Sequence, residues 1–126
     1  MSEIWIIDDF SAALDQFEAA MHVVPASDLI KAGCIQYFEF TFELAWKSVK
    51  ILAEQNGLEP GGSPRSCLKT GFAQGWIDDE PLWLAMLEIR NRMSHTYHAK
   101  EALQVYDRLS HFPRPMRILL AALRTA

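Results

Sequence analysis

The apolar residues of the first segment recur at helical spacing. They occupy Ile7, Phe10, Leu14, Phe17 and Met21. Steps of three and four residues place them on one stripe of an amphipathic helix over residues 4–22, with the aspartates of the segment turned to water. Pro25 ends this helix, and Ser27 is predicted to cap the next one, which carries Asp28 in its first turn.

A second helix is predicted from Asp28 to Gln55, with Asn56-Gly57 as its stop. Its segment IQYFEFTFELAWKSVKIL carries two adjacent stripes of residues along the helix, and Trp46 widens the first stripe on its other side. The apolar stripe is Phe38, Phe42, Ala45, Val49 and Leu52, and the more mixed one is Tyr37, Thr41, Leu44, Ser48 and Ile51. Apolar surface this broad indicates burial on more than one side, so the helix is either central to a bundle or part of an oligomer interface.

The rest of the chain also has helical patterns. A connector rich in glycine and proline, residues 57–64, precedes a short helix predicted over 65–72, and the acids before Pro81 mark a further helix start. A last helical region begins near Ala99, where Pro113 and Pro115 are expected to leave Met116–Arg124 as a separate segment. The pattern contains no strand of useful length. It predicts one all-α domain over residues 1–126, an up-down bundle of about five helices.

Composition narrows the class of protein. Half of the 126 residues are apolar and 11% are aromatic, which argues against disorder. No apolar run is long enough to span a membrane, and the start MSEIWIIDDF lacks the features of a signal peptide, so a cytoplasmic protein is expected. Cys34 and Cys67 have neither metal-ligand nor disulfide-rich spacing and are expected to be reduced and at least partly buried.

Charge is divided unevenly along the chain. Through Gly62 there are 10 acidic and 3 basic residues, whereas the remainder has 6 acidic and 9 basic residues, including all seven arginines. Arginine is the side chain best suited to bidentate phosphate contact. Asymmetry of this kind is common in proteins of every function, so it favours an anionic ligand only weakly.

The most unusual stretch is RNRMSHTYH, which spans Arg90–His98 and holds two of the four histidines. The chain has no P-loop, no GxGxxG and no legible nucleophile triad. His95 and His98 lack a third ligand at characteristic spacing, so we expect neither a metal nor another cofactor.

Arginine and histidine together can process an RNA phosphodiester without a metal. Histidine can accept the proton of a ribose 2′-hydroxyl or protonate the leaving oxygen. Arginine can stabilise the negative charge that builds on the phosphate. The candidate pair is Arg90 and His95, followed by Tyr97.

Helical geometry complicates this hypothesis. At about 100° per residue, Arg90 and Tyr97 share a helix face, but His95 lies about 140° from Arg90. Either the helix is distorted near Ser94, or the long arginine reaches around, or a second protomer completes the site. In the alternative without catalysis, Arg90 pairs with a nearby acid, while His95 and Tyr97 cap and pack.

The motif resembles a known family. Arg90, Asn91, His95 and Tyr97 match the Arg-x4-His-x-Tyr motif of HEPN domains, with a polar residue directly after the arginine. The stretches FEFTFELAWKSVK and WLAMLEIRNRMSHTYH resemble HEPN proteins once labelled nucleotidyltransferase substrate-binding proteins, and the likeness covers roughly residues 5–124.

The resemblance implies a helical homodimer that partners a cognate minimal nucleotidyltransferase. In the toxin branch of this family the domain is a metal-independent endoribonuclease, and the motif residues of two protomers meet in one cleft. Carried over, Arg90 and His95 are catalytic and Asn91 supports the site. Tyr97 matches the tyrosine that the nucleotidyltransferase can AMPylate to silence the toxin.

Three hypotheses follow, and we favour them in this order. The first is an RNase toxin of a toxin–antitoxin pair. The second is a non-catalytic substrate-binding subunit of a nucleotidyltransferase, in which Phe40, Phe42 and Trp46 of the aromatic helix serve an interface or base stacking. The third, a purely structural bundle, leaves RNRMSHTYH without a reason. Residues that could contact substrate or partner are Arg92, Ser94, His98 and Trp46.

Overall fold

A computed structural model describes residues 4–93 and 98–126. This part of the chain is helical and contains no strand. Its six α-helices and one 3-10 helix are α1 (Ile4–Met21), α2 (Asp28–Gln55), α3 (Pro64–Ala73), α4 (Glu80–Met93), α5 (Ala99–Gln104), η1 (Val105–His111) and α6 (Pro113–Thr125). The all-α prediction is confirmed, with six helices where about five were expected.

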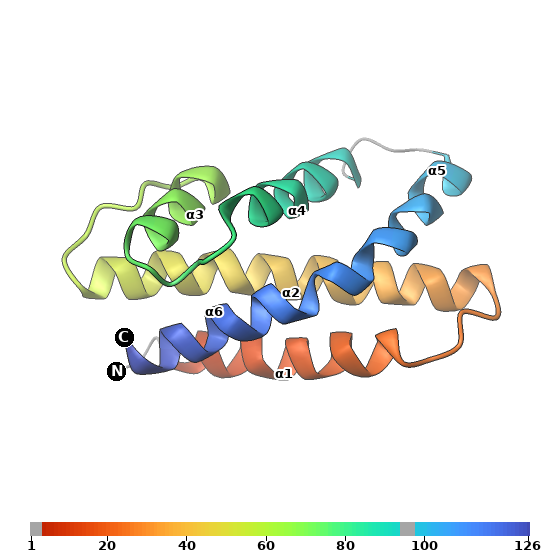
Figure 1. Ribbon diagram of the computed structural model, residues 1–126, viewed down its shortest axis with the longest axis horizontal. Helices are drawn as coiled ribbons and strands as arrows, with labels where there is room; N and C mark the ends of the chain where they lie inside the picture. Colours follow the sequence, from red (N-terminus) through yellow and green to blue (C-terminus); the bar gives the residue numbers. More distant parts are fainter. Residues whose placement is uncertain (1–3, 94–97) are drawn as a thin grey trace.

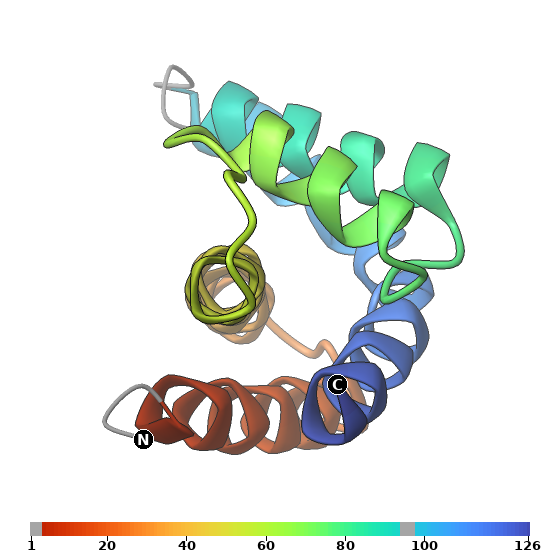
Figure 2. The ribbon, with the colours of Figure 1, turned by 90° about the vertical axis from the view of Figure 1, so that its left-hand side faces the viewer.

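Helix α2 is the central element of the bundle. It runs antiparallel to α1, and α3 with α4 lies on its opposite side (Figure 1). Viewed along α2, the other helices surround it from α1 through α6 to α3 and α4, and leave one side of α2 uncovered (Figure 2). The breadth of its apolar surface is thus explained by burial on several sides within one chain.

The ends of α2 follow the predicted chemistry. The Ser27 side chain accepts a hydrogen bond from the Ile30 backbone N–H at 3.2 Å, so it caps the helix as expected. At the other end Gly57 adopts a φ of 79°, which glycine tolerates without steric cost. The N–H of Leu58 then bonds the carbonyl of Ala53 at 2.9 Å, closing the helix in the manner of a Schellman motif.

The C-terminal region differs from the prediction in one boundary. Helix α6 begins at Pro113 and includes Pro115, rather than starting at Met116 after both prolines. Proline fits the first turn of a helix because the N–H it lacks has no intrahelical partner there. The break falls before Pro113, where the η1 turn ends at His111.

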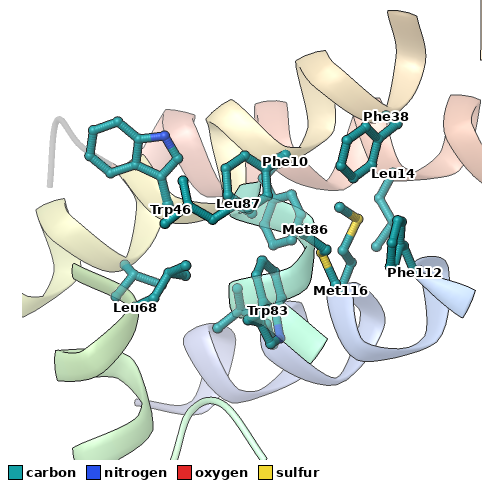
Figure 3. Packing of buried hydrophobic residues seen from close by; sticks show 14 of the residues in the cluster. Phe10, Leu14, Phe38, Trp46, Leu68, Trp83, Met86, Leu87, Phe112 and Met116 are labelled. Atoms are coloured by element: carbon teal, nitrogen blue, oxygen red, sulfur yellow. The ribbon is translucent and has the colours of Figure 1, made fainter. Parts of the chain in front are cut away.

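An aromatic cluster fills the space between α2, α4 and the C-terminal helices (Figure 3). Phe38 lies at its centre, with ring centroids 5.3 Å from Phe112 and 6.1 Å from both Phe17 and Phe42. Trp83 of α4 packs 6.2 Å from Phe42 and is fully buried. These contacts fix the position of α4 against α2, which matters because α4 carries the first residues of the motif.

Ion pairs join α6 to α1 on the surface. Arg117 donates to Glu18 and, at 3.0 Å, to Asp15, while Arg124 lies 3.4 Å from Asp8. The acids of the first segment therefore meet arginines of the last segment, and the uneven charge along the chain is partly neutralised by folding. None of the described helices is long and apolar enough to cross a membrane.

The two cysteines are buried and free, in agreement with the prediction. Burial raises the pKa of the Cys34 thiol and of the Cys67 thiol. Both side chains therefore behave as small core residues rather than reactive thiolates.

Candidate functional site

Arg90 lies in the last turn of α4 and reaches across to α2. Its Nε donates to Oε2 of Glu43 at 2.7 Å, and its Nη2 donates to Oε1 of the same carboxylate at 3.2 Å. Two parallel N–H···O bonds fix both the position and the plane of the guanidinium. The side chains are about 30% exposed, so the pair lies at the edge of the core and within reach of solvent.

Glu43 is also bonded from its own helix. Oε1 accepts a hydrogen bond from the indole Nε1 of Trp46 at 3.1 Å, so this carboxylate is held by groups from α2 and α4 together. A carboxylate held in this way cannot rotate freely, and it transmits its fixed orientation to Arg90. Trp46 therefore contributes to the site through its N–H.

The proposed aromatic contact surface on α2 needs correction. Phe42 is fully buried in the core, so it offers no surface for a partner or a base. Trp46 is only 7% exposed, whereas Phe40 is 51% exposed. Phe40 and Phe42 are two positions apart and therefore point in different directions, and the packing of α4 onto α2 covers Phe42 through Trp83.

A second carboxylate, Glu39, lies one helical turn before Glu43. Desolvation raises the pKa of the Glu39 carboxyl, and the negative charge of Glu43 raises it further, against the opposing effect of Arg90. Two acids and one guanidinium thus share a partly desolvated region. While both acids are ionised, these three groups together carry one net negative charge, and they become neutral as a set when Glu39 is protonated.

The other described motif residues surround the end of α4. Asn91 is exposed, and its Oδ1 accepts a hydrogen bond from Nη1 of Arg90 at 3.0 Å. Arg92 pairs with Glu88 at 2.9 Å on a well-exposed face. His98 is exposed and precedes α5 as its N-terminal flanking residue. Arg90 and Asn91 are therefore in contact, while Arg92 lies on another side of α4.

Ser94, His95 and Tyr97 lie outside the described residues. Their sequence position places them between Met93, the last residue of α4, and His98. The roles predicted for His95 and Tyr97 therefore stay predictions. Among the described residues, no three His, Cys, Asp or Glu side chains gather closely enough to hold a metal ion.

Glu39 and Glu43 are site residues that sequence reasoning missed. They recur at a spacing of four in FEFTFE, so they share one face of α2 beside the apolar stripe. This acidic pair at the border of a largely apolar helix face is the sequence feature that could have identified them. Only the fold shows that the basic partner of Glu43 is Arg90, which lies 47 residues away in the chain.

Comparisons with known proteins identify the family of this chain. The family described as nucleotidyltransferase substrate binding protein like matches residues 6–125. A Haemophilus influenzae protein named probable ribonuclease HepT is 33% identical over 101 residues, which cover 77% of this chain and 69% of that protein.

Two solved structures share the fold. One, from Thermus thermophilus, has a TM-score of 0.80 and 30% identity over 91% of this chain and 98% of its own. The other is a Haemophilus influenzae protein described as revealing the fold of a substrate binding domain of a nucleotidyltransferase. It has a TM-score of 0.78 and 29% identity over 94% of this chain and 98% of its own. Together with the near-complete family match, these likenesses show that the chain belongs to the nucleotidyltransferase substrate binding protein family.

Proposed function

We propose that the protein is a metal-independent endoribonuclease, the toxin of a toxin–antitoxin pair. The observation that carries this proposal is Arg90, held in a fixed orientation by Glu43 and Asn91 immediately before the segment that contains His95. A relative with 33% identity carries the name probable ribonuclease HepT, which is consistent with the same chemistry.

The proposed reaction uses the RNA itself as nucleophile. His95 accepts the proton of a ribose 2′-hydroxyl as its oxygen attacks the adjacent phosphorus, and Arg90 stabilises the negative charge that develops on the phosphate oxygens. The bond from phosphorus to the 5′-oxygen breaks, and that oxygen takes up the proton that His95 accepted, directly or through water. The products are a 2′,3′-cyclic phosphate and a free 5′-hydroxyl.

The protein is proposed to act as a homodimer that associates with a cognate minimal nucleotidyltransferase. Phe40 is exposed and lines, together with Glu43, a cavity between α1 and α2, so this side of α2 adjoins the Glu43–Arg90 pair. A second copy on this side would bring two arginine sites close together. AMPylation of Tyr97 by the nucleotidyltransferase would add a bulky negative group and repel the phosphates of RNA.

A second candidate is a non-catalytic substrate-binding subunit of a nucleotidyltransferase. The observation that favours it is that the charge of Arg90 is neutralised by Glu43, with Glu39 close by, which weakens attraction for a phosphate. One solved relative is described as a substrate binding domain of a nucleotidyltransferase. Binding of the nucleotidyltransferase with no cleavage by the unmodified protein would support this candidate.

The test is cleavage of a mixed RNA pool in EDTA by the wild type, Arg90→Ala and His95→Ala. Arg65→Ala is the matched control, because Arg65 is an exposed arginine on α3. Mass measurement first establishes that Tyr97 is unmodified, and circular dichroism establishes that each variant folds. We expect cyclic-phosphate products from the wild type and the control, and a loss of roughly 10²-fold or more in the two site variants. Undiminished cleavage by both site variants would refute the assigned roles.

A further inference from the structure

A cavity of about 550 Å³ opens on the side of α4 that faces α5 and η1. Its lining residues are Ile89, Arg92, Met93, Glu101, Gln104, Val105 and Arg108. Arg90 belongs to a different side of the helix, where it bonds Glu43 of α2. The cavity is therefore separate from the guanidinium site, although Met93 at its edge immediately precedes the remaining motif residues.

The lining combines three kinds of chemistry. Ile89 is buried, and Val105 is half-buried beside it, so the floor is apolar. Arg108 of η1 contributes one guanidinium group, and Arg92 of α4 contributes a second one that is already paired with Glu88. A cavity of this size with an apolar floor and a few polar groups falls in the usual range for small-ligand sites.

This combination fits a nucleotide better than a simple anion. Guanidinium groups bind phosphate oxygens and also stack on the faces of bases. The apolar floor accommodates the base, and the amide of Gln104 can both donate to and accept from a base edge. The carboxylate of Glu101 repels a phosphate but can accept a hydrogen bond from the amino group of a base. The phosphate is therefore assigned to the side of the cavity where the arginines lie.

We infer that this cavity, with Arg108 as its principal phosphate contact, binds one nucleotide. The nucleotide is either a unit of an RNA strand whose neighbouring phosphate lies at Arg90, or a free mononucleotide; the recognised chemistry is the same. The RNA form of this inference rests on the proposed function. A strand occupying both sites would cross the end of α4, beside the motif.

The experiment measures binding without cleavage. A fluorescein-labelled, fully 2′-O-methylated short RNA lacks the attacking hydroxyl, so its anisotropy reports binding alone, and AMP titrated by calorimetry tests the free nucleotide. The variants are Arg108→Ala and Arg108→Lys. Arg65→Ala is the matched control because it removes the same charge from the exposed surface of α3.

Arg108→Ala is expected to weaken binding of the RNA, of AMP, or of both about tenfold relative to Arg65→Ala. If RNA is the ligand, the slope of log affinity against log salt concentration should also fall by about 0.7, the value for one phosphate contact to a single strand, and Arg108→Lys should restore it. A change with RNA alone identifies a strand unit, and a change with AMP alone identifies a free mononucleotide. Binding of both probes equal to that of Arg65→Ala would overturn the inference.

The proposed function is tested separately, because cleavage in EDTA does not enter this measurement. Wild-type protein that binds through Arg108 but never cleaves RNA would leave the nucleotide site standing and refute the ribonuclease. If the wild type cleaves RNA but Arg108→Ala binds both probes as tightly as Arg65→Ala does, the ribonuclease stands and the nucleotide site is refuted. Circular dichroism of the Arg108 variants excludes unfolding as a cause.

Discussion

Glu43 of α2 holds Arg90 of α4 in a two-bond contact, with Nε–Oε2 and Nη2–Oε1 distances of 2.7 and 3.2 Å. The pair joins the longest helix to the start of the motif. It explains how a flexible side chain at the end of α4 acquires one orientation. It also means that the proposed role of Arg90 as a phosphate ligand would depend on an acid 47 residues away in the chain.

Glu43→Gln should disturb both stability and function. The glutamine keeps the size of the side chain but loses the charge that binds Arg90. We expect a loss of about 1 kcal/mol in the free energy of unfolding, because the pair is one-third exposed and partly screened. RNA cleavage should fall at the same time, since the guanidinium plane is no longer fixed.

Glu88→Gln is the matched control for that variant. Glu88 pairs with Arg92 on one face of α4, and both side chains are about two-thirds exposed. Such a pair contributes about 0.3 kcal/mol to stability, so the free energy of unfolding measured in urea should barely change. Equal losses in the two variants would show that the Glu43–Arg90 contact has no special role.

Glu39→Gln should change how stability depends on pH. Desolvation, and then Glu43, raise the pKa of Glu39 above its ordinary value of 4.5. The folded protein therefore binds this proton more tightly than the unfolded chain, and stability is lost as pH rises through the folded pKa. The variant avoids that loss, so its melting temperature relative to the wild type should rise between acidic and neutral pH.

Glu59→Gln serves as the comparison, because Glu59 is exposed in the connector between α2 and α3. Calorimetric melting at several pH values measures both variants. The raised pKa of Glu39 would be contradicted if the melting temperature of Glu39→Gln relative to the wild type stayed constant across the pH range or declined toward neutral pH.

Phe38 and Phe40 should respond very differently to truncation. Phe38 is fully buried among three aromatic rings, so Phe38→Ala should cost about 3–5 kcal/mol in unfolding free energy. Phe40 is 51% exposed on the same helix, and Phe40→Ala should cost less than about 0.5 kcal/mol in the monomer.

Urea denaturation at several protein concentrations separates packing from association. A Phe40→Ala loss that depends on concentration would indicate that a second copy covers Phe40, as the proposed dimer requires. A cost for Phe38→Ala below about 1 kcal/mol would contradict its central place in the core.

Two helical glycines should give opposite results on replacement by alanine. A Cβ at Gly71 would meet Ile77 Cδ1 at 3.0 Å and Val49 Cγ1 at 3.3 Å, so close packing of α3 against α2 depends on its absence. Gly71→Ala should cost about 1–3 kcal/mol. A Cβ at Gly33 meets nothing within 4 Å, so Gly33→Ala should gain about 0.5–1 kcal/mol from helix propensity. Thermal melting of the two variants checks both signs, and a stabilised Gly71→Ala would show that α3 can move away from α2.

Much of the fold could be predicted because local rules determine it. The bounds of α2, its Ser27 cap and its stop at Gly57 depend on residues within one turn of each other, and the structure confirms them. The helical pattern of α1 and the reduced, buried cysteines follow from similarly local or compositional reasoning. The start of α6 was predicted too late because proline ends a helix in one position and begins it in another, and the sequence alone did not decide between them.

The sequence by itself determined the helices, the class of fold and the presence of an arginine, an asparagine and a histidine at family spacing. Only the tertiary structure decided that Glu43 binds Arg90, that Phe42 is buried while Phe40 is exposed, and that Arg92 and Arg108 share a cavity. The physical reason is the distance along the chain between the residues that interact. Helix formation depends on neighbours three or four residues apart, whereas each of these contacts depends on the angle and depth at which two helices pack.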